Sequence, residues 1–318
     1  MRLVHSLAEL DAAPAGPTVL SVGNFDGVHR AHQLLLAGVC TDARARGARP
    51  TVLTFEPHPL RILRPDSAPR LITPLPEKIR LLAACGVELL VVLPFSRDLS
   101  LLSPRAFAAD ILVERLGVRA VHEGQGFRFG HRQAGDIATL AELATEFDFA
   151  LRVHQPVVIR GQVVSSSRIR AFIEAGAVVC AGRLLGRPFA VRQTVTSGRG
   201  VGRRLTVPTL NLGAYPELLP AQGVYVTRTE VGGRSFDSVT NVGTRPTFED
   251  APPTLSVESH LLDFEPLDVR PDQSPMEIAF LHRLREERRF ASPALLREQI
   301  LADVARARRY FRLRVRET

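Results

Sequence analysis

The sequence SVGNFDGVHRAHQ occupies residues 21–33, between two contrasting patterns. The apolar run at residues 18–20 predicts the end of a buried strand, and residues 34–37 continue with helical spacing. A strand, a glycine-containing turn and a helix start favour phosphate binding, because glycine lets the backbone approach a ligand and helix N–H groups favour anions. His29 and His32 lie three residues apart on the first helical turn, so both side chains could reach one phosphate.

Length and composition indicate a globular protein of about two domains. The chain has 318 residues, of which 45% are hydrophobic, and compact domains usually run about 100 to 200 residues. No apolar stretch approaches the roughly 20 residues needed to cross a bilayer. The start of the chain carries Glu9 and Asp11 and lacks the apolar core of a signal peptide. We therefore expect a cytoplasmic protein.

The cysteines and the charge exclude some classes of protein. Cys40, Cys85 and Cys180 are scattered and form no C-x-x-C pair, so neither a disulfide framework nor a zinc site is expected. The net charge of +8 comes almost entirely from arginine, with Lys78 the only lysine. Single-strand nucleic-acid binding usually needs aromatic residues among the basic ones, yet the chain has no Trp and three Tyr. Nucleic acid is therefore a minor hypothesis.

The first part of the chain alternates predicted strands and helices. Strands are predicted at residues 50–55, 88–94, 118–122 and 151–158, with helices around 77–85 and from Ser103 onward. This rhythm predicts a doubly wound α/β sheet, in which ligands collect at the carboxyl ends of the strands.

The second part of the chain has a different pattern. Short β-type runs broken by Gly and Pro predict a small β-barrel; they lie at residues 190–196, 223–230, 236–242, 254–264 and 276–281. From Ser292 an apolar stripe predicts a C-terminal helix with arginines on its other face. We place the domain boundary between residues 182 and 183, giving domains 1–182 and 183–318.

The string GNFDGVHRAHQ closely resembles the signature of the bacterial bifunctional riboflavin kinase/FAD synthetase family. The resemblance implies that the first domain is an FMN adenylyltransferase with a Rossmann-like nucleotidylyltransferase fold, and that the second is a riboflavin kinase. Ala31 replaces the glycine of the family's H-x-G-H motif. The residues implied to bind ATP phosphates are Gly23, Asn24, Phe25, Asp26, Gly27, His29 and His32, the two histidines as catalytic residues.

Three further motifs of the first domain match the family in order. The segment PTVLTFEPHPL at residues 50–60 matches T-F-x-P-H-P, which lines the flavin side, and VVSSSRIR at 163–170 matches S-S-T-x-I-R, which completes the nucleotide pocket. The loop at 124–130 matches G-x-D/N-F-x-F-G, but Gly126 replaces the Asp or Asn. A lost polar contact to a nucleotide costs about 1 to 3 kcal/mol. The resemblance implies flavin binding by Pro57, His58 and Phe127, and nucleotide binding by Ser165, Ser166 and Arg168.

Motifs of the second domain match the kinase module. The loop with Gly198, Gly200 and Gly202 is implied to bind nucleotide, and P-T-L-N at 208–211 resembles the family's P-T-A-N. There Thr209 and Asn211 would hold the ATP-bound Mg²⁺, which prefers a few oxygen ligands. Asn-Val-Gly at 241–243 and the strand around Glu258 follow in family order. Departures are T-V at 206–207 for G-F and EPLDVRPDQSP at 265–275 for D-L-Y-G.

Glu258 matches the family's general base, although an outward-facing Glu in an alternating strand is the simpler interpretation of that residue alone. Arg285, in LREERRF, matches a flavin-binding position.

The resemblance implies phosphorylation of riboflavin to FMN and adenylylation of FMN to FAD, with Mg²⁺ as cofactor and ATP as co-substrate. Riboflavin and FMN would be the other substrates; no membrane partner is expected, and a homo-oligomer is left open. The first alternative is a riboflavin kinase whose adenylyltransferase domain is weakened or inactive. The second is another nucleotidylyltransferase, and the third is a non-catalytic flavin- or nucleic-acid-binding regulator.

Overall fold

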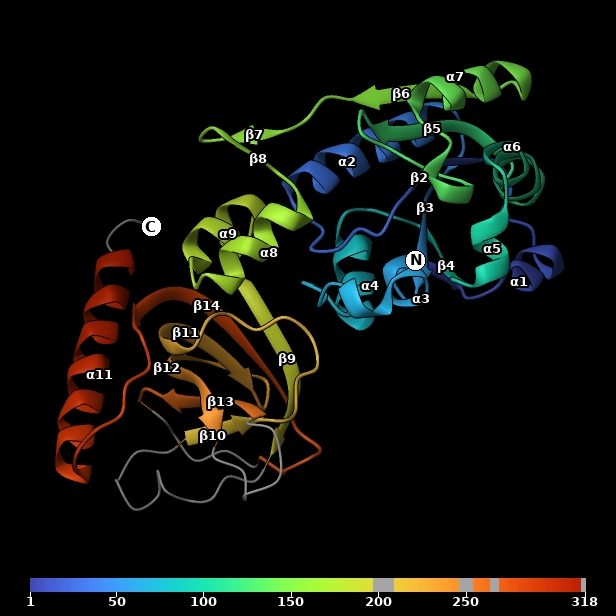
Figure 1. Ribbon diagram of the computed structural model, residues 1–318. Coiled ribbons are helices and arrows are strands. Elements are labelled where there is room, and N and C mark those ends of the chain that lie inside the picture. Colours follow the sequence, from blue (N-terminus) through green and yellow to red (C-terminus); the bar gives the residue numbers. More distant parts are fainter. Residues whose placement is uncertain (197–208, 246–253, 264–268, 316–318) are drawn as a thin grey trace. The chain divides into compact units, whose positions relative to one another are not determined.

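The computed structural model describes residues 1–196, 209–245, 254–263 and 269–315 (Figure 1). The chain forms two compact units, Met1–Ser166 and Ser167–Thr318. Helices α8 (Ser166–Glu174) and α9 (Val178–Leu185) therefore fall almost entirely within the second unit. The domain boundary between residues 182 and 183 stays a prediction. In the described parts of the chain, no helix combines the length and apolar character needed to cross a membrane.

The first unit is built on a six-stranded parallel sheet in the order β1-β4-β3-β2-β5-β6. This confirms the predicted doubly wound α/β fold. The chain passes from β2 to β3 on one side, and β5 pairs with β2 on the other, so the strand order reverses between β2 and β5. The strands are Arg2–Val4, Thr18–Val22, Arg49–Glu56, Leu89–Pro94, Val118–Gly124 and Ala150–His154.

Helices cover both faces of this sheet, and each face has its own core. One core joins Val19, Val52 and Leu90 of the strands to Leu36 and Leu82 of the helices. The other core joins the opposite faces of the same strands to the segment that follows α6. The helices of this unit are α1 (Leu7–Ala12), α2 (Arg30–Ala45), α3 (Pro59–Leu63), α4 (Leu75–Ala84), α5 (Arg97–Leu101), α6 (Pro104–Ala106) and α7 (Ile137–Glu146).

One local prediction is confirmed with an added detail, and another needs correction. The helix expected from Ser103 does begin with Ser103 as its N-cap, but from Phe107 to Arg115 it is wound as a π-helix. The strand expected at 151–158 ends at His154, because Pro156 has no N–H for a sheet. The chain resumes as a small hairpin of β7 (Val158–Ile159) and β8 (Gln162–Val163). All three cysteines are free thiols, of which Cys40 is buried.

The second unit contains a closed antiparallel barrel in the order β10-β13-β12-β11-β14-β9. The predicted small barrel and C-terminal helix are confirmed. In Figure 1 the helix α11 (Pro293–Val315) runs along one side of the barrel. The strands are β9 Phe189–Thr196, β10 Thr209–Leu212, β11 Gly223–Val231, β12 Arg234–Arg245, β13 Thr254–Leu261 and β14 Pro275–Arg285.

The two faces of the barrel wall differ in chemistry. On the outer face, Val224 and Val226 of β11 and Val239 of β12 pack against Ala307 and Phe311 of α11. The outer face beside β11 and β12 is therefore covered rather than open to water. On the inner face, buried hydroxyls hydrogen-bond to one another at 2.7 to 3.1 Å; they belong to Thr227, Thr229, Ser238, Thr240 and Ser259.

Candidate active sites

The turn after β2 is a braced structure at the carboxyl edge of the sheet. The N–H of Gly23 donates to the carbonyl of Leu53 at 3.0 Å. Phe25 has a φ of 47° and is only 3% exposed, so its ring anchors the turn in the core. Gly27 has a φ of 88°, which favours glycine. Asn24 lies between these positions and is partly exposed. Residues 23–27 are therefore held in shape by contacts within the protein.

Asp26 provides much of this bracing. Its carboxylate accepts hydrogen bonds from the backbone N–H of Thr73 at 3.0 Å and of Ile72 at 3.2 Å. Its backbone carbonyl accepts a hydrogen bond from the Ser166 hydroxyl at 2.8 Å. The turn is thus tied both to the loop before α4 and to the predicted serine motif. Of that motif, Ser165 is partly buried and Arg168 is exposed on α8.

His29 and His32 lie together at the start of α2, as the sequence predicts. Their rings stack with centroids 3.6 Å apart and planes 13° apart. His29 is the N-cap residue, and its Nδ1 accepts the N–H of His32 at 3.3 Å. Burial, together with His29 and Lys78, holds the pKa of His32 well below its usual value. His32 is therefore neutral at neutral pH, and its Nδ1 has no hydrogen-bond partner among the described residues.

The predicted flavin-side residues follow the neighbouring strand. Glu56 ends β3, and Pro57 and His58 come next, on the same sheet edge as the histidine turn. His58 is the N-cap of α3, where its Nδ1 accepts the N–H of Leu60 at 3.2 Å. Pro57 and His58 therefore form a rigid corner beside the turn.

The loop after β5 lies on the other side of β2. Phe129 is 7% exposed, packs against Phe107 and forms a backbone bridge to Gly135. Phe127 is half-buried and stacks on Phe129 with centroids 5.3 Å apart. Gly126 is exposed, and a Cβ there would meet no heavy atom within 4 Å. The loop is anchored through its phenylalanines, and its tip has room for a side chain.

Sequence reasoning assigned no role to Lys78, although its uniqueness was visible. Its side chain is only 2% exposed, and lysine is seldom buried without a partner. Burial lowers the pKa of Lys78, while Asp26 and Glu56 oppose that shift. Lys78 thus places a positive charge between the turn and the end of β3.

Strand register brings together the predicted kinase residues of the second unit. Asn211 on β10 lies directly opposite Glu258 on β13, and Glu258 lies opposite Asn241 on β12. Thr209 lies two residues before Asn211 and opposite His260. Directly opposed residues of antiparallel strands share a face. Thr209, Asn211 and Glu258 therefore lie on the outer face of the barrel wall, with Asn211 only 6% exposed.

Asn211, Glu258 and Asn241 form a row of directly opposed residues across the barrel wall, and this row continues to the end of β14. Asn241 lies opposite Val224, and Val224 lies opposite Arg285. Arg285 forms an ion pair with Asp303 of α11, with its Nη2 2.8 Å from Oδ2. A Cβ on Gly243 would collide with the Glu287 carboxylate, so the loop after Arg285 lies against β12 near Asn241. This loop connects the row of Asn211, Glu258 and Asn241 to α11.

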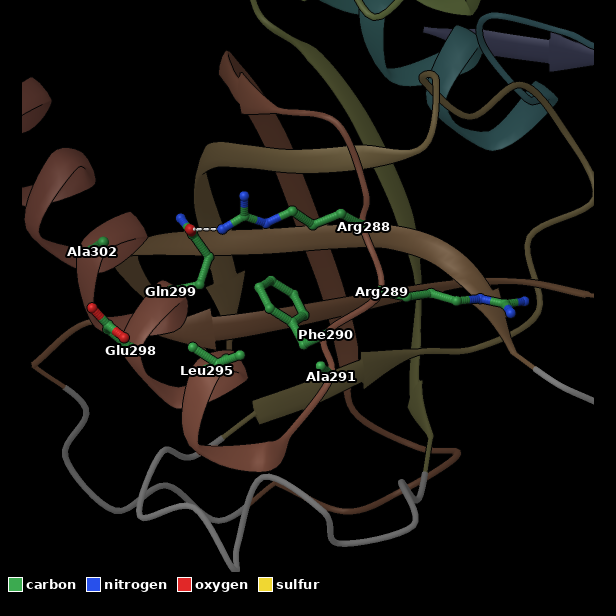
Figure 2. A pocket seen from close by; sticks show the side chains of 8 residues that line it. All are labelled: Arg288, Arg289, Phe290, Ala291, Leu295, Glu298, Gln299 and Ala302. Carbon is green, nitrogen blue, oxygen red and sulfur yellow. Dashed lines mark hydrogen bonds between the residues drawn. The ribbon is translucent and has the colours of Figure 1, made fainter.

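A pocket of about 400 Å³ lies between this loop and α11 (Figure 2). Phe290 lies 4.9 Å from the guanidinium of Arg288 and 5.7 Å from that of Arg285. Arg288 hydrogen-bonds Gln299 of α11, whereas the Arg289 side chain extends away from the others in Figure 2. Ligand pockets of this volume, with an aromatic wall, suit a drug-sized ring system. The lining residues are Arg288, Arg289, Phe290, Ala291, Leu295, Glu298, Gln299 and Ala302.

Comparison with known proteins finds a matching family for each of the two units. The FAD synthetase family model matches residues 12–168, and the riboflavin kinase family model matches residues 185–311. The chain is 35% identical over 314 residues to the bifunctional riboflavin kinase/FMN adenylyltransferase of Escherichia coli (strain K12), covering 98% of this chain and 99% of that protein. The chain belongs to this bifunctional family. The family expected from the sequence motifs is confirmed.

Other members of the family and one solved structure are also similar. The protein of the same name from Pseudomonas fluorescens is 36% identical over 310 residues, covering 97% of each chain. A crystal structure from Streptococcus pneumoniae, titled a macrolide-efflux protein, has a TM-score of 0.87 and 28% sequence identity. It covers 97% of this chain and 99% of its own. The likeness to that structure thus extends over nearly the whole chain.

Some predicted residues of this family member lie outside the described ranges. They are the loop glycines Gly198, Gly200 and Gly202, together with Pro208 and residues 246–248. Within the described ranges, no group of three or more His, Cys, Asp or Glu side chains is placed to hold a metal ion. The hydroxyl of Thr209 and the amide of Asn211 fit Mg²⁺, which usually takes few protein oxygens and completes its shell with water and phosphate.

Proposed function

We propose that the second unit phosphorylates riboflavin with ATP, and that the first unit transfers an adenylyl group from a second ATP to the resulting FMN. The products would be ADP and FMN in the first reaction, and FAD and pyrophosphate in the second. The strand register of the barrel carries the proposal, because it brings Thr209, Asn211 and Glu258 onto one face of the wall. Membership of the bifunctional family supports both steps.

In the kinase step, Glu258 acts as the general base. Its carboxylate accepts the proton of the riboflavin 5′-hydroxyl while that oxygen bonds to the γ-phosphorus of ATP and the bond to the β–γ bridging oxygen breaks. A primary hydroxyl is a weak nucleophile until its proton is removed. Glu258 is partly exposed, so the proton can pass on to water.

Thr209 and Asn211 are the residues that would hold Mg²⁺ in this unit. When bound with ATP, the ion supplies charge neutralisation to the phosphates during transfer. The two residues provide oxygen ligands at fixed positions, because the β10–β13 register holds both side chains beside Glu258. Positioning and electrostatics account for most of the catalysis of phosphoryl transfer.

The pocket beside Phe290 receives the flavin ring. Its aromatic wall and volume suit a planar tricyclic ring, and the loop that lines it starts in the same row as Glu258. Arg285 acts mainly by shaping this pocket, because its guanidinium is engaged by Asp303 and by the carbonyl of Glu286. Positioning the ring here would direct the ribityl chain toward the row.

In the adenylyl step, an oxygen of the FMN phosphate bonds to the α-phosphorus of ATP, and the bond to the α–β bridging oxygen breaks. His32 is a neutral imidazole at a helix start, so it donates a hydrogen bond to a phosphate oxygen rather than forming an ion pair with it. His29, stacked on it, faces the same phosphate. Residues 23–27 present backbone to the nucleotide. Pro57, His58 and Phe127 flank the turn toward the flavin. No covalent enzyme intermediate is required.

Chromatography of the flavins tests both steps at once. Purified protein is incubated with ATP and Mg²⁺, first with riboflavin and then with FMN. FAD from both starting flavins is the expected result. FMN alone from riboflavin, with added FMN unchanged, would identify a kinase with an inactive first unit; Ala31 and Gly126 motivate that second candidate. Failure to form either flavin would overturn the proposal.

A further inference from the structure

A buried carboxyl group lies at the point where β2 and β5 separate. Glu123, near the end of β5, is only 3% exposed. Its Oε1 accepts the backbone N–H of Val22 at 2.6 Å and the hydroxyl of Ser21 at 3.3 Å. Backbone pairing between β2 and β5 ends earlier, at Leu20 and Val121. The Glu123 side chain thus replaces the missing strand partner of Val22.

This position lies at the switch point of the sheet, where ligands of doubly wound folds bind. Val22 directly precedes Gly23, the first residue of the histidine turn. Glu123 directly precedes Gly124, the first residue of the loop with Gly126 and Phe127. One side chain therefore links the two backbone segments on either side of the proposed nucleotide site.

The surroundings of Glu123 favour the neutral acid. Burial raises the pKa of this carboxyl group well above its usual value, against the two hydrogen bonds from Val22 and Ser21. No cation of the described residues contributes to the shift, and an unpaired buried carboxylate is costly. His122, the preceding residue, is engaged with Asp42 and His154. Titratable or charged groups on the neighbouring elements include Asp42, His122, Arg152 and His154, with Asp26, His29, His32 and Lys78 at the histidine turn and α4.

We propose that Glu123 is a positioning residue of the adenylyl-transfer site and acts as a neutral carboxylic acid that holds the end of β2 in place for the nucleotide. The inference rests on the proposed function of the first unit. A carboxylate at this position would repel the polyphosphate of ATP through a poorly hydrated interior. ATP binding therefore favours the protonated form, and affinity falls once Glu123 has lost its proton.

Two variants separate position from charge. Glu123→Gln keeps a carbonyl oxygen for the Val22 N–H and carries no charge, whereas Glu123→Leu removes the acceptor. The KM for ATP in FAD formation from FMN is measured from about pH 7 to 9, above the range in which the low-pKa histidine His32 titrates. For the parent we expect KM to rise with pH once Glu123 loses its proton, because its pKa is raised by burial. The KM of Glu123→Gln should stay low and should not change with pH. The KM of Glu123→Leu should be raised at least tenfold at every pH, because the end of β2 has lost the side chain that positions it.

The kinase reaction provides the internal control, since Glu123 lies outside that unit and FMN formation should be unchanged in every variant. Glu142→Gln removes an exposed carboxylate of the same unit and should follow the parent. Two results would overturn the proposal. One is that the KM of Glu123→Gln rises with pH as steeply as that of the parent; the other is that Glu123→Leu has the same KM for ATP as the parent.

Denaturant unfolding of the first unit tests the neutral acid even if the parent forms no FAD. The folded state keeps a proton that the unfolded chain has released above about pH 4.5, so stability should fall as pH rises through the raised pKa of Glu123. Glu123→Gln should remove that decline. Equal declines in parent and variant would refute a neutral Glu123 independently of any activity.

Discussion

The guanidinium of Arg285, at the end of β14, is paired with the carboxylate of Asp303 on α11. Nη2 and Nε lie 2.8 and 2.9 Å from Oδ2, and the side chains are 16% and 3% exposed. Gln299 donates to the other carboxylate oxygen at 2.8 Å. This pair joins the strand that enters the row of Glu258 to the helix that closes the Phe290 pocket. It therefore couples the stability of the barrel to the shape of the proposed flavin site.

Removing the carboxylate of Asp303 should lower the stability of the barrel and weaken riboflavin binding. Asp303→Ala leaves the partly buried Arg285 without its carboxylate, which should cost less than the roughly 3 to 5 kcal/mol typical of breaking a fully buried pair. We expect a lower denaturant midpoint for the second unit and a raised KM for riboflavin, with FAD formation from FMN unchanged. The control is Asp263→Ala, which breaks the exposed pair with Arg308 and should cost less than about 1 kcal/mol. Similar midpoints for the two variants would contradict a stabilising pair between Arg285 and Asp303.

Glu258→Gln should abolish FMN formation. The amide keeps the size of the side chain but cannot accept the proton of the 5′-hydroxyl, and general-base catalysis is typically worth about 10² to 10⁴ in rate. ATP binding and the adenylylation of added FMN should persist. Glu230→Gln, an equivalent change at an exposed position of β11, serves as the control. Normal kinase turnover in Glu258→Gln would remove Glu258 from the role of base.

The fold was predictable because its signals are local. Alternating apolar runs gave the strands, and the serine and proline at 103–104 gave a helix start that the structure confirms. The sequence also allowed Glu258 to be outward-facing, and it is. What the sequence could not show is that the outer face of this barrel is covered along β11 and β12 by α11. An outward-facing residue on β11 or β12 is therefore packed against a helix rather than open to water.

The sequence could not show which residues far apart in the chain contact one another in the two sites. Asp303 falls among the apolar positions of α11, but nothing local identifies Arg285 as its partner. Glu123 interrupts an apolar strand, and its meaning depends on where β2 ends. Lys78 was visible as the only lysine, but its burial follows from packing. These contacts join residues 18 to 101 positions apart, which periodicity within a segment does not report.

Gly126→Asp should increase FAD formation if the loop lacks a polar contact to the nucleotide. The position is exposed and a Cβ meets no atom within 4 Å, so the side chain can be added without strain. A regained hydrogen bond of about 1 to 3 kcal/mol would lower KM or raise kcat/KM for ATP by roughly 5- to 150-fold. Gln125→Asp adds the same charge one residue earlier and should have no such effect. An unchanged rate in Gly126→Asp would mean that another residue already supplies the contact.

A second pair of histidines should make the first unit sensitive to acid. Nδ1 of His122 lies 3.0 Å from Nε2 of His154, and Nε2 of His122 lies 3.1 Å from the Asp42 carboxylate. Burial is the main cause that lowers the pKa of both histidines. Below the unfolded pKa of about 6.5, the unfolded chain therefore binds more protons than the folded one.

Stability of the first unit should accordingly fall as pH drops from about 6.5 toward the lowered pKa values of His122 and His154. Protonated His122 would also turn a second N–H toward His154 and break their hydrogen bond. His154→Gln keeps an N–H donor for His122 but does not titrate, so it should reduce the loss. Hydrogen exchange of the β5 and β6 amides, compared between variants at each pH, measures the effect. His5→Gln, at an exposed position, is the control; equal acid sensitivity in both variants would place the titration elsewhere.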